Sequence, residues 1–155
     1  MFIDNKLQVL GIKLEDVNSS TFPFVPVIRT GELVYTSGQD CRENGVNIFE
    51  GKIGKDISLV DGQKAARQCA INCLSVLKCY LGSLDKVKQV VKVSGFVQSY
   101  EGFWEQPYVM NGASDIFIDV FGEKGRHVRS AIGVNELPFN TPVEVEVIVE
   151  VENNL

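Results

Sequence analysis

The sequence lacks the clusters of histidine and cysteine that zinc sites need and the long apolar runs that membrane segments need. It contains one histidine, His127, and its four cysteines include no Cys-x-x-Cys pair. We therefore expect no zinc site and no other metal site. No apolar run approaches the ~20 residues that a membrane-spanning helix needs, and the N-terminus lacks the basic and apolar segments of a secretory signal. A cytoplasmic location is the resulting expectation.

Basic residues are also in deficit. The chain has 15 Lys and Arg against 20 Asp and Glu, which gives a formal net charge of −5. A strongly basic surface for nucleic acid is therefore not expected. The 155 residues are 45% hydrophobic, and no linker rich in proline, glycine or serine divides them. This length and composition are typical of a single domain, 1–155, with one core.

The apolar spacing predicts two main helices. The first spans about 60–81, with Ser58 and Asp61 as a capping pair before it and Gly82 as its stop. The second spans about 107–121 and carries a proline in its first turn. A short helix is also possible at 5–13. Alternating or β-branched stretches predict strands in the segments 25–39 (two strands around a turn), 45–54, 88–98, 129–134 and 143–151. This order favours an α+β fold, with a mixed sheet and both helices packed on one face.

Alternation along the strands predicts which side chains share the sheet face without helices. In the last strand the valines should face the helices, which leaves Glu144 and Glu146 on the other face. In the segment 129–134 we place Ile132 and Val134 under the helices. The open face should then carry Arg129, Ala131 and Gly133, together with Lys92. These charges fit an ordinary solvated face with cross-strand pairs. They also fit an assembly surface that holds a small anionic ligand.

Several stretches resemble the RidA (YjgF/YER057c/UK114) family. The segment "VRSAIGVNELPFNTPVEVEVIVEV" carries an Arg-Ser strand start, a Leu-Pro turn and a Val-Glu terminal strand, as in that family. The stretches "LVYTSGQ" and "VVKVSGFV" are similar to two further family strands. The resemblance implies a chorismate-mutase-like fold and a homotrimer with sites between subunits. It also implies that residues 1–20 are an N-terminal extension, because compact members are shorter.

The resemblance implies an activity and a set of site residues. The activity is hydrolysis of reactive 2-imino and enamino acids to 2-keto acids and ammonia, without metal or organic cofactor. Arg129 matches the arginine that holds the substrate carboxylate, and a guanidinium fork suits a planar carboxylate. Glu144 matches the glutamate that positions the attacking water. Further pocket positions that the resemblance assigns to substrate binding are Ser37, Gly38, Phe24, Asn111, Ala131 and Gly133.

Three of these positions depart from the compact members. Phe24 replaces a tyrosine, Ala131 replaces a cysteine and Gly133 replaces a glutamate. A second hypothesis is therefore a non-catalytic trimer that binds a small carboxylic acid and serves as a binding or regulatory protein. The ribonuclease activity ascribed to some family members fits poorly with the acidic chain.

The sequence assigns no function to three residues that lie near these motifs. His127 has the pKa of a general base but no orienting carboxylate beside it in the sequence, so we expect it at the rim of the site. Arg126 is expected in solvent. Cys41 follows the "SGQD" stretch and is expected near the pocket mouth, with a nucleophilic role as an alternative.

Overall fold

A five-stranded mixed sheet forms the centre of the protein in a computed structural model that describes residues 2–17 and 22–153. Residues 18–20 of the expected N-terminal extension lie outside the described residues. The strand order is β1-β2-β7-β5-β6, in which only β5 and β6 pair in parallel. The bounds are β1 Val27–Thr30, β2 Leu33–Thr36, β5 Val87–Gln98, β6 Val128–Val134 and β7 Val143–Val151. A separate small ladder pairs β3 (Arg42–Glu43) with β4 (Val46–Asn47).

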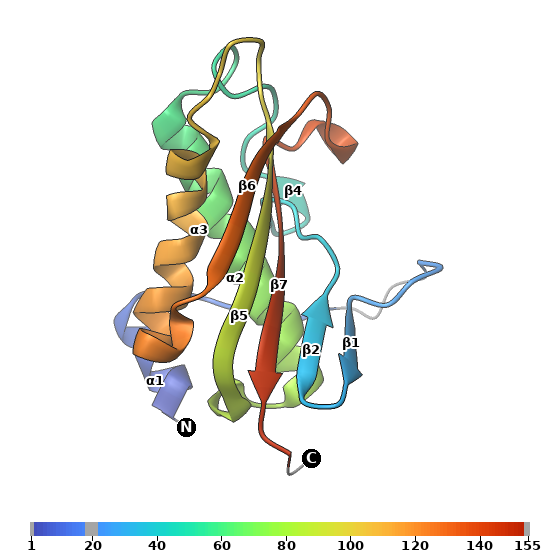
Figure 1. The fold of residues 1–155 in the computed structure, drawn as a ribbon, viewed down its shortest axis with the longest axis vertical. Coiled ribbons are helices and arrows are strands. Elements are labelled where there is room, and N and C mark those ends of the chain that lie inside the picture. Colours follow the sequence, from blue (N-terminus) through green and yellow to red (C-terminus); the bar gives the residue numbers. More distant parts are fainter. Residues whose placement is uncertain (1, 18–21, 154–155) are drawn as a thin grey trace.

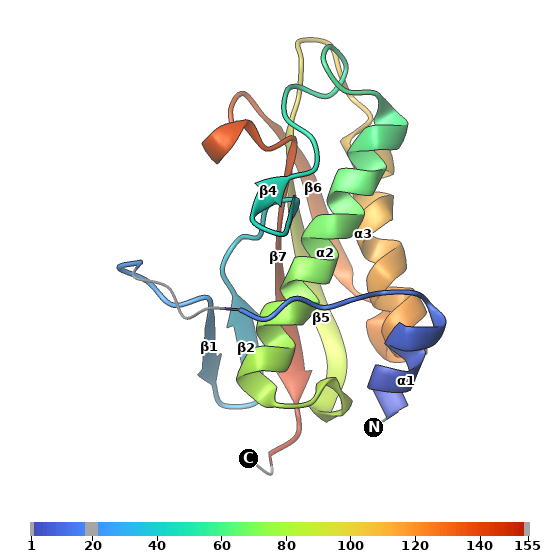
Figure 2. The same cartoon turned by 180° about the vertical axis from the view of Figure 1, so that it is seen from behind.

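Both long helices cover the same face of this sheet. Figure 1 looks onto the open face of the sheet, and Figure 2 shows α2 (Leu59–Leu81) and α3 (Gln106–Phe121) side by side on the other face. The predicted α+β fold with two helices on one face is thus confirmed. A third, short helix, α1 (Phe2–Val9), begins earlier than predicted. The Asp85 carboxylate accepts hydrogen bonds from the backbone N–H groups of Phe2 and Ile3. These two bonds cap the first turn of α1.

The ends of α2 follow the predicted capping residues. The Ser58 hydroxyl accepts a hydrogen bond from the Asp61 backbone N–H at 3.1 Å. Gly82 adopts a left-handed conformation (φ 78°) and its N–H donates to the Lys78 carbonyl. Only glycine adopts this conformation without a steric penalty, so the helix ends there.

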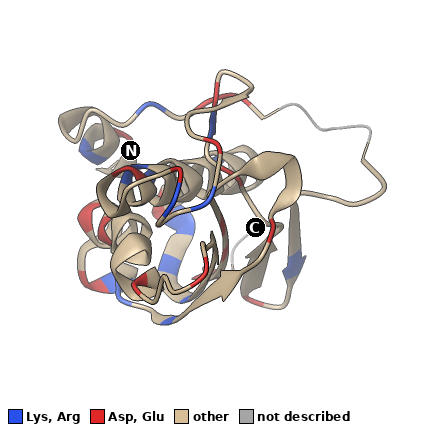
Figure 3. Cartoon of the chain, turned by 90° about the horizontal axis from the view of Figure 1, so that it is seen from above, with Lys and Arg blue, Asp and Glu red and all other residues tan. Residues whose placement is uncertain are grey.

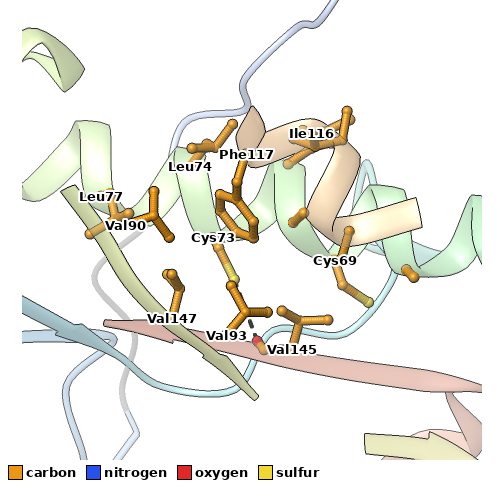
Figure 4. Close-up of a cluster of buried hydrophobic side chains, with 14 of the residues drawn as sticks. Cys69, Cys73, Leu74, Leu77, Val90, Val93, Ile116, Phe117, Val145 and Val147 are labelled. Atoms are coloured by element: carbon orange, nitrogen blue, oxygen red, sulfur yellow. Dashed lines mark hydrogen bonds between the residues drawn. The ribbon is translucent and has the colours of Figure 1, made fainter. Parts of the chain in front are cut away.

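The core lies between the helices and β7. All five valines of β7 are buried, as the alternation predicts. Cys69 and Cys73 of α2 face them, and their thiols donate to the carbonyls of Val143 and Val145. Figure 4 shows Cys73 between the Phe117 ring and β7. Burial raises the pKa of the Cys73 thiol to about 12. The buried cysteines therefore act as small core residues that also tie α2 to the sheet.

The predicted faces of β6 are wrong. Arg129 points to the helix side, where its guanidinium donates to acceptors on α3. Ala131 packs against the core beneath the helices. A Cβ on Gly133 would meet the Gln106 side chain of α3, so this residue also faces that helix. Ile132 lies on the open face and is 48% exposed. The parallel register agrees, because it sets Arg129 beside the buried Val93 of β5.

The reason is that β6 is an edge strand with apolar side chains on both faces. Val128 and Ile132 lie on one face and Ala131 on the other. Because both faces carry apolar residues, alternation alone leaves two possible orientations of the strand. A shift of one residue exchanges the two faces. In β7, and in β5 beyond the register shift between Val90 and Lys92, one face is strongly apolar and the predicted faces are confirmed. Lys92, Glu144 and Glu146 lie on the open face, although Arg129 does not join them.

Charged residues of both signs are interspersed over the helices and loops (Figure 3). Within residues 2–17 and 22–153, none of the helices combines the length and apolar character needed to cross a membrane.

Candidate functional site

A cleft of about 460 Å³ opens beside the start of β7, a size that is typical of small-molecule sites. We call it the Glu144 cleft. Its polar wall includes Ser37, Gly38 and Glu144, and its apolar wall includes Phe24 and Phe139. Four of the residues that the family resemblance assigns to the site, Phe24, Ser37, Gly38 and Glu144, thus lie together. The rings of Phe22 and Phe24 stack with centroids 5.2 Å apart and form one side.

Gly38 lies directly against the Glu144 carboxylate. The Gln39 N–H donates to the Val145 carbonyl, and the Val145 N–H donates back to the Gln39 carbonyl, which joins the two segments. A Cβ built on Gly38 would lie 2.3 Å from Glu144 Oε1. Any other residue at position 38 would therefore displace the carboxylate, because ordinary contacts begin about 1 Å further away. The glycine makes room for the carboxylate in its present position.

The position of Glu144 favours its protonated form. The side chain is half-buried, and burial raises the pKa of this carboxyl above its ordinary value. The negative charges of Asp40 and Glu146 raise that pKa further. A carboxylate with a raised pKa accepts a proton more readily near neutral pH, as a general base must.

The rim of the cleft contains residues that the sequence reasoning missed. Arg42 pairs with Asp40 at 2.9 Å, and its guanidinium lies 4.9 Å from the centre of the Phe139 ring. In the sequence, Asp40 and Arg42 follow the "SGQ" stretch closely. This proximity is the signal that could have placed them at the cleft.

Phe139 is held at the rim by a buried glutamine. Phe139 and Asn140 both have positive φ, 58° and 60°, which is costly for residues other than glycine. The fully buried Gln98 amide donates to Asn140 Oδ1 and accepts from the Leu137 N–H. These bonds hold the turn in its strained conformation and fix where the Phe139 ring lies.

Arg129 lies apart from this cleft, between β6 and α3. Its Nη1 donates to Asn111 Oδ1 at 2.9 Å and to Ser114 Oγ at 3.1 Å, and its Nη2 donates to the Pro107 carbonyl at 3.2 Å. A guanidinium has five N–H donors. Its Nε–H and one Nη2–H make no hydrogen bond to the described residues. No carboxylate among these residues forms an ion pair with Arg129 either, so its charge is held by neutral acceptors and can bind an anion.

The other predicted positions divide between these two groups. Asn111 is bonded to Arg129, and Ala131 and Gly133 follow Arg129 on the same face of β6. Glu144 pairs with Phe96 of β5, which pairs with Ile132, three residues beyond Arg129. Two strand spacings and three residues along the strand put the Cα atoms of Arg129 and Glu144 about 14 Å apart. Because their side chains also point to opposite faces, one chain does not bring the two groups together.

A model of the family described as "YjgF/chorismate mutase-like, putative endoribonuclease" matches residues 4–151 of the chain. The chain belongs to the YjgF/chorismate mutase-like family. The resemblance to RidA proteins seen in the sequence is thereby confirmed, and it extends over both long helices and the whole sheet.

Several proteins are similar to the chain over most of their length. Protein TCP17 of Trypanosoma cruzi is 43% identical over 148 residues, which cover 95% of this chain and 92% of that protein. A 2-iminobutanoate/2-iminopropanoate deaminase of Dermatophagoides farinae is 30% identical over 132 residues, 84% of this chain and 87% of that protein. The crystal structure of Atu1372 from Agrobacterium tumefaciens, a protein of unknown function, superposes with a TM-score of 0.91 at 41% identity. It covers 97% of this chain and 94% of that one.

Three further residues near the motifs, Arg126, Cys41 and His127, lie outside the two groups described above. Arg126 is exposed and pairs with Glu123, as expected for a solvated residue. Cys41 lies beside the cleft, between its lining residues Asp40 and Arg42, but its thiol is fully buried near Thr141 Oγ1 and does not line the cleft. His127 was expected at the rim of the site, and it adjoins the Arg129 group through Ser114. The ring is half-buried and both of its nitrogens are hydrogen-bonded.

Proposed function

We propose that the protein hydrolyses 2-imino acids, and the enamines that tautomerise to them, to 2-keto acids and ammonia. The observation that carries this proposal is Arg129, whose charge has no carboxylate partner among the described residues and whose Nε and Nη2 retain free donors. Two adjacent N–H groups match the two oxygens of a carboxylate. The similarity to a 2-iminobutanoate/2-iminopropanoate deaminase supports the same substrate class.

The half-buried Glu144 provides the second requirement of the reaction. The carbon of a protonated imine is electrophilic, so the enzyme needs chiefly to orient a water molecule and to move its proton. In the proposed reaction Glu144 takes a proton as the water oxygen bonds to the imine carbon. Glu144 then passes this proton to the nitrogen. As the carbon–nitrogen bond breaks, the hydroxyl of the adduct gives its own proton to Glu144 and becomes the keto oxygen, and the ammonia that leaves takes up that proton as ammonium. Water supplies the keto oxygen, so the atoms balance.

The two groups are proposed to meet between subunits. A small imino acid cannot reach from Arg129 to Glu144 within one chain, given the ~14 Å between their Cα atoms and their opposite faces. In a closed homotrimer, the edge formed by β6 and α3 of one subunit would approach the Glu144 cleft of the next. The exposed apolar side chains on and beside the sheet support such an assembly, since it would cover Ile28, Val128 and Ile132.

A coupled assay tests the activity. An amino-acid oxidase generates the imine, and the protein's effect on the rate of keto-acid and ammonia formation is measured. We expect Arg129→Ala and Glu144→Gln to lower the rate at least about 100-fold, the usual contribution of a general base or a charge clamp. Arg126→Ala is the matched control, because this neighbouring arginine is exposed and should leave the rate unchanged. An unchanged rate with Arg129→Ala would refute the proposal.

Mixing the two inactive variants tests the location of the site. After co-refolding of Arg129→Ala with Glu144→Gln in equal amounts, about one site in four would combine an intact Arg129 from one subunit with an intact Glu144 from its neighbour. Recovery of about a quarter of the wild-type activity is expected. No recovery would mean that the two groups do not meet across a subunit interface. If calorimetry shows that a 2-keto acid binds while the wild type has no activity, the non-catalytic binding protein is the better description.

A further inference from the structure

His127 is more than a rim residue, because its ring is connected to Arg129 through a serine of α3. His127 Nδ1 lies 2.6 Å from the Gly125 carbonyl oxygen, and its Nε2 lies 2.9 Å from Ser114 Oγ. The same Ser114 oxygen accepts a hydrogen bond from Arg129 Nη1. The Phe117 ring packs against the imidazole edge-on, with centroids 5.9 Å apart, and restricts its rotation.

The direction of each hydrogen bond in this chain follows from its first member. A carbonyl oxygen can only accept, so Nδ1 must carry the proton that is donated to Gly125. Burial, together with the charge of Arg129, lowers the pKa of His127 and thereby favours the neutral ring. In a neutral ring with a proton on Nδ1, Nε2 is an acceptor. The Ser114 hydroxyl must then donate to Nε2, which leaves its lone pairs for Arg129.

The charged groups around the ring are consistent with this neutral form. Arg129 of β6 is the cation connected to the His127 ring, through the hydrogen bonds of Ser114. On the segment before the ring, Glu123 and Arg126 pair with one another. Burial lowers the pKa of Arg129, and the negative charge of Asp115 on α3 opposes this effect. No carboxylate among the described residues bonds to the imidazole. The hydrogen bond to the Gly125 carbonyl favours the imidazolium, but burial opposes it and has the larger effect on the pKa of His127.

We propose that His127 and Ser114 are positioning residues, which hold the Arg129 guanidinium so that its unused Nε–H and Nη2–H edge stays available for the substrate carboxylate. The proposal rests on the function proposed for Arg129 above. The reason is geometric: the Ser114 bond, together with those to Asn111 and Pro107, prevents rotation of the guanidinium. A serine hydroxyl free to rotate would at times direct its own proton toward Arg129 and weaken this restraint.

Nuclear magnetic resonance tests the hydrogen-bond chain without any substrate. His127 is the only histidine, so the imidazole ¹⁵N signals of tag-free protein need no assignment. We expect the neutral Nδ1–H tautomer at pH 7.5. We also expect separate, slowly exchanging Nη signals for Arg129, assigned by their loss in Arg129→Lys, and their averaging in Ser114→Ala. An Nε2–H tautomer, or Arg129 signals that are the same in Ser114→Ala, would overturn the proposal.

Kinetics in the coupled assay test the consequence for substrate binding. Ser114→Ala should raise KM about tenfold, with kcat changed less than about twofold, since a hydrogen bond to the charged guanidinium is lost. His127→Phe should also raise KM with little change in kcat, because Ser114 loses the acceptor that directs its proton away from Arg129. Phenylalanine retains the ring contact with Phe117 but cannot accept from Ser114. His127→Gln should recover most of the lost affinity, because its amide oxygen can accept that proton.

Ser75→Ala is the matched control, since Ser75 is also a buried helical serine, but its hydroxyl donates to the Ile71 carbonyl within α2. If Ser75→Ala raises KM equally, or if kcat falls with KM unchanged in the His127 and Ser114 variants, the positioning role is wrong. If the wild type lacks deaminase activity and binds no 2-keto acid, the proposed function fails. The tautomer and the Arg129 signals still decide the positioning role in that case.

Discussion

Gly38→Ala offers the sharpest single test of how the Glu144 cleft works. The added Cβ would lie 2.3 Å from Glu144 Oε1 and 2.7 Å from its carboxyl carbon. Ordinary contact distances begin near 3.4 Å, so the carboxylate must move by about 1 Å. A displacement of this size at a catalytic group costs roughly 100-fold in rate. We therefore expect kcat/KM for imine hydrolysis to fall about 100-fold, which corresponds to about 2.7 kcal/mol in transition-state stabilisation.

The same substitution should leave the fold intact. Gly38 lacks the positive φ found at the turn glycines, so alanine fits its backbone. Replacing such a glycine removes flexibility from the unfolded chain and contributes about 0.4–1 kcal/mol to stability. This gain partly offsets the cost of moving the Glu144 side chain. The melting temperature, followed by circular dichroism, should therefore change by no more than ~4 °C.

Gly31→Ala is the control for a loss of stability alone. Gly31 has a φ of 60° in the β1–β2 turn and no atoms within 4 Å of a built Cβ. Alanine in this conformation costs about 1 kcal/mol without touching Glu144. Its melting temperature should fall while kcat/KM stays at the wild-type value. If Gly38→Ala retains kcat/KM within about threefold, the position of the Glu144 carboxylate does not limit the reaction, and the argument from Gly38 is refuted.

Three further predictions concern stability and reactivity. Because the pKa of Glu144 is raised in the fold, its ionised form destabilises the protein above that pKa, and the effect disappears as pH falls below the ordinary value. Glu144→Gln should therefore raise the melting temperature at pH 8 but not at pH 4; an equal rise at both would contradict the burial argument. Cys79 is exposed and should react rapidly with a thiol reagent in the native protein, whereas the other three cysteines should react only on unfolding. Rapid native labelling of more than one thiol per chain would show that the core opens. Phe117 is fully buried between α3, the sheet and the His127 ring, so Phe117→Ala should lower the unfolding free energy by about 3–5 kcal/mol in urea titration. A loss below about 1 kcal/mol would mean that the core collapses around the cavity.

The elements that could be predicted from the sequence are those with a strong, one-sided pattern. α2 has an apolar stripe, a serine cap and a terminal glycine, and these signals agree with one another. β7 alternates valine with glutamate, so its buried face was unambiguous. The residues of the Glu144 cleft could be named from motifs near β2 and β7. Their proximity depends on the pairing of Gln39 with Val145, which no local pattern indicates.

The β6 segment shows where sequence reasoning reached its limit. Its apolar residues are distributed over both faces, so the period of two was clear but the orientation was not. The helix that covers an edge strand decides which face is buried, and here α3 supplies three acceptors for Arg129. His127 was likewise assigned to the rim, because the sequence does not show that Ser114 and Gly125 lie beside its ring.

The sequence by itself determined the α+β class, the family resemblance and the ends of α2, and the resemblance named Arg129 and Glu144 as candidates for a site that binds a small carboxylate. These properties follow from residues that are close together in the sequence. Capping hydrogen bonds mark the ends of a helix, and the periodic burial of side chains distinguishes helices from strands. Only the tertiary structure decided that Arg129 and Glu144 point to opposite faces of the sheet and that His127 is connected to Arg129 through Ser114. Both depend on how α3 packs against β6, a contact between segments whose relative placement no local pattern encodes.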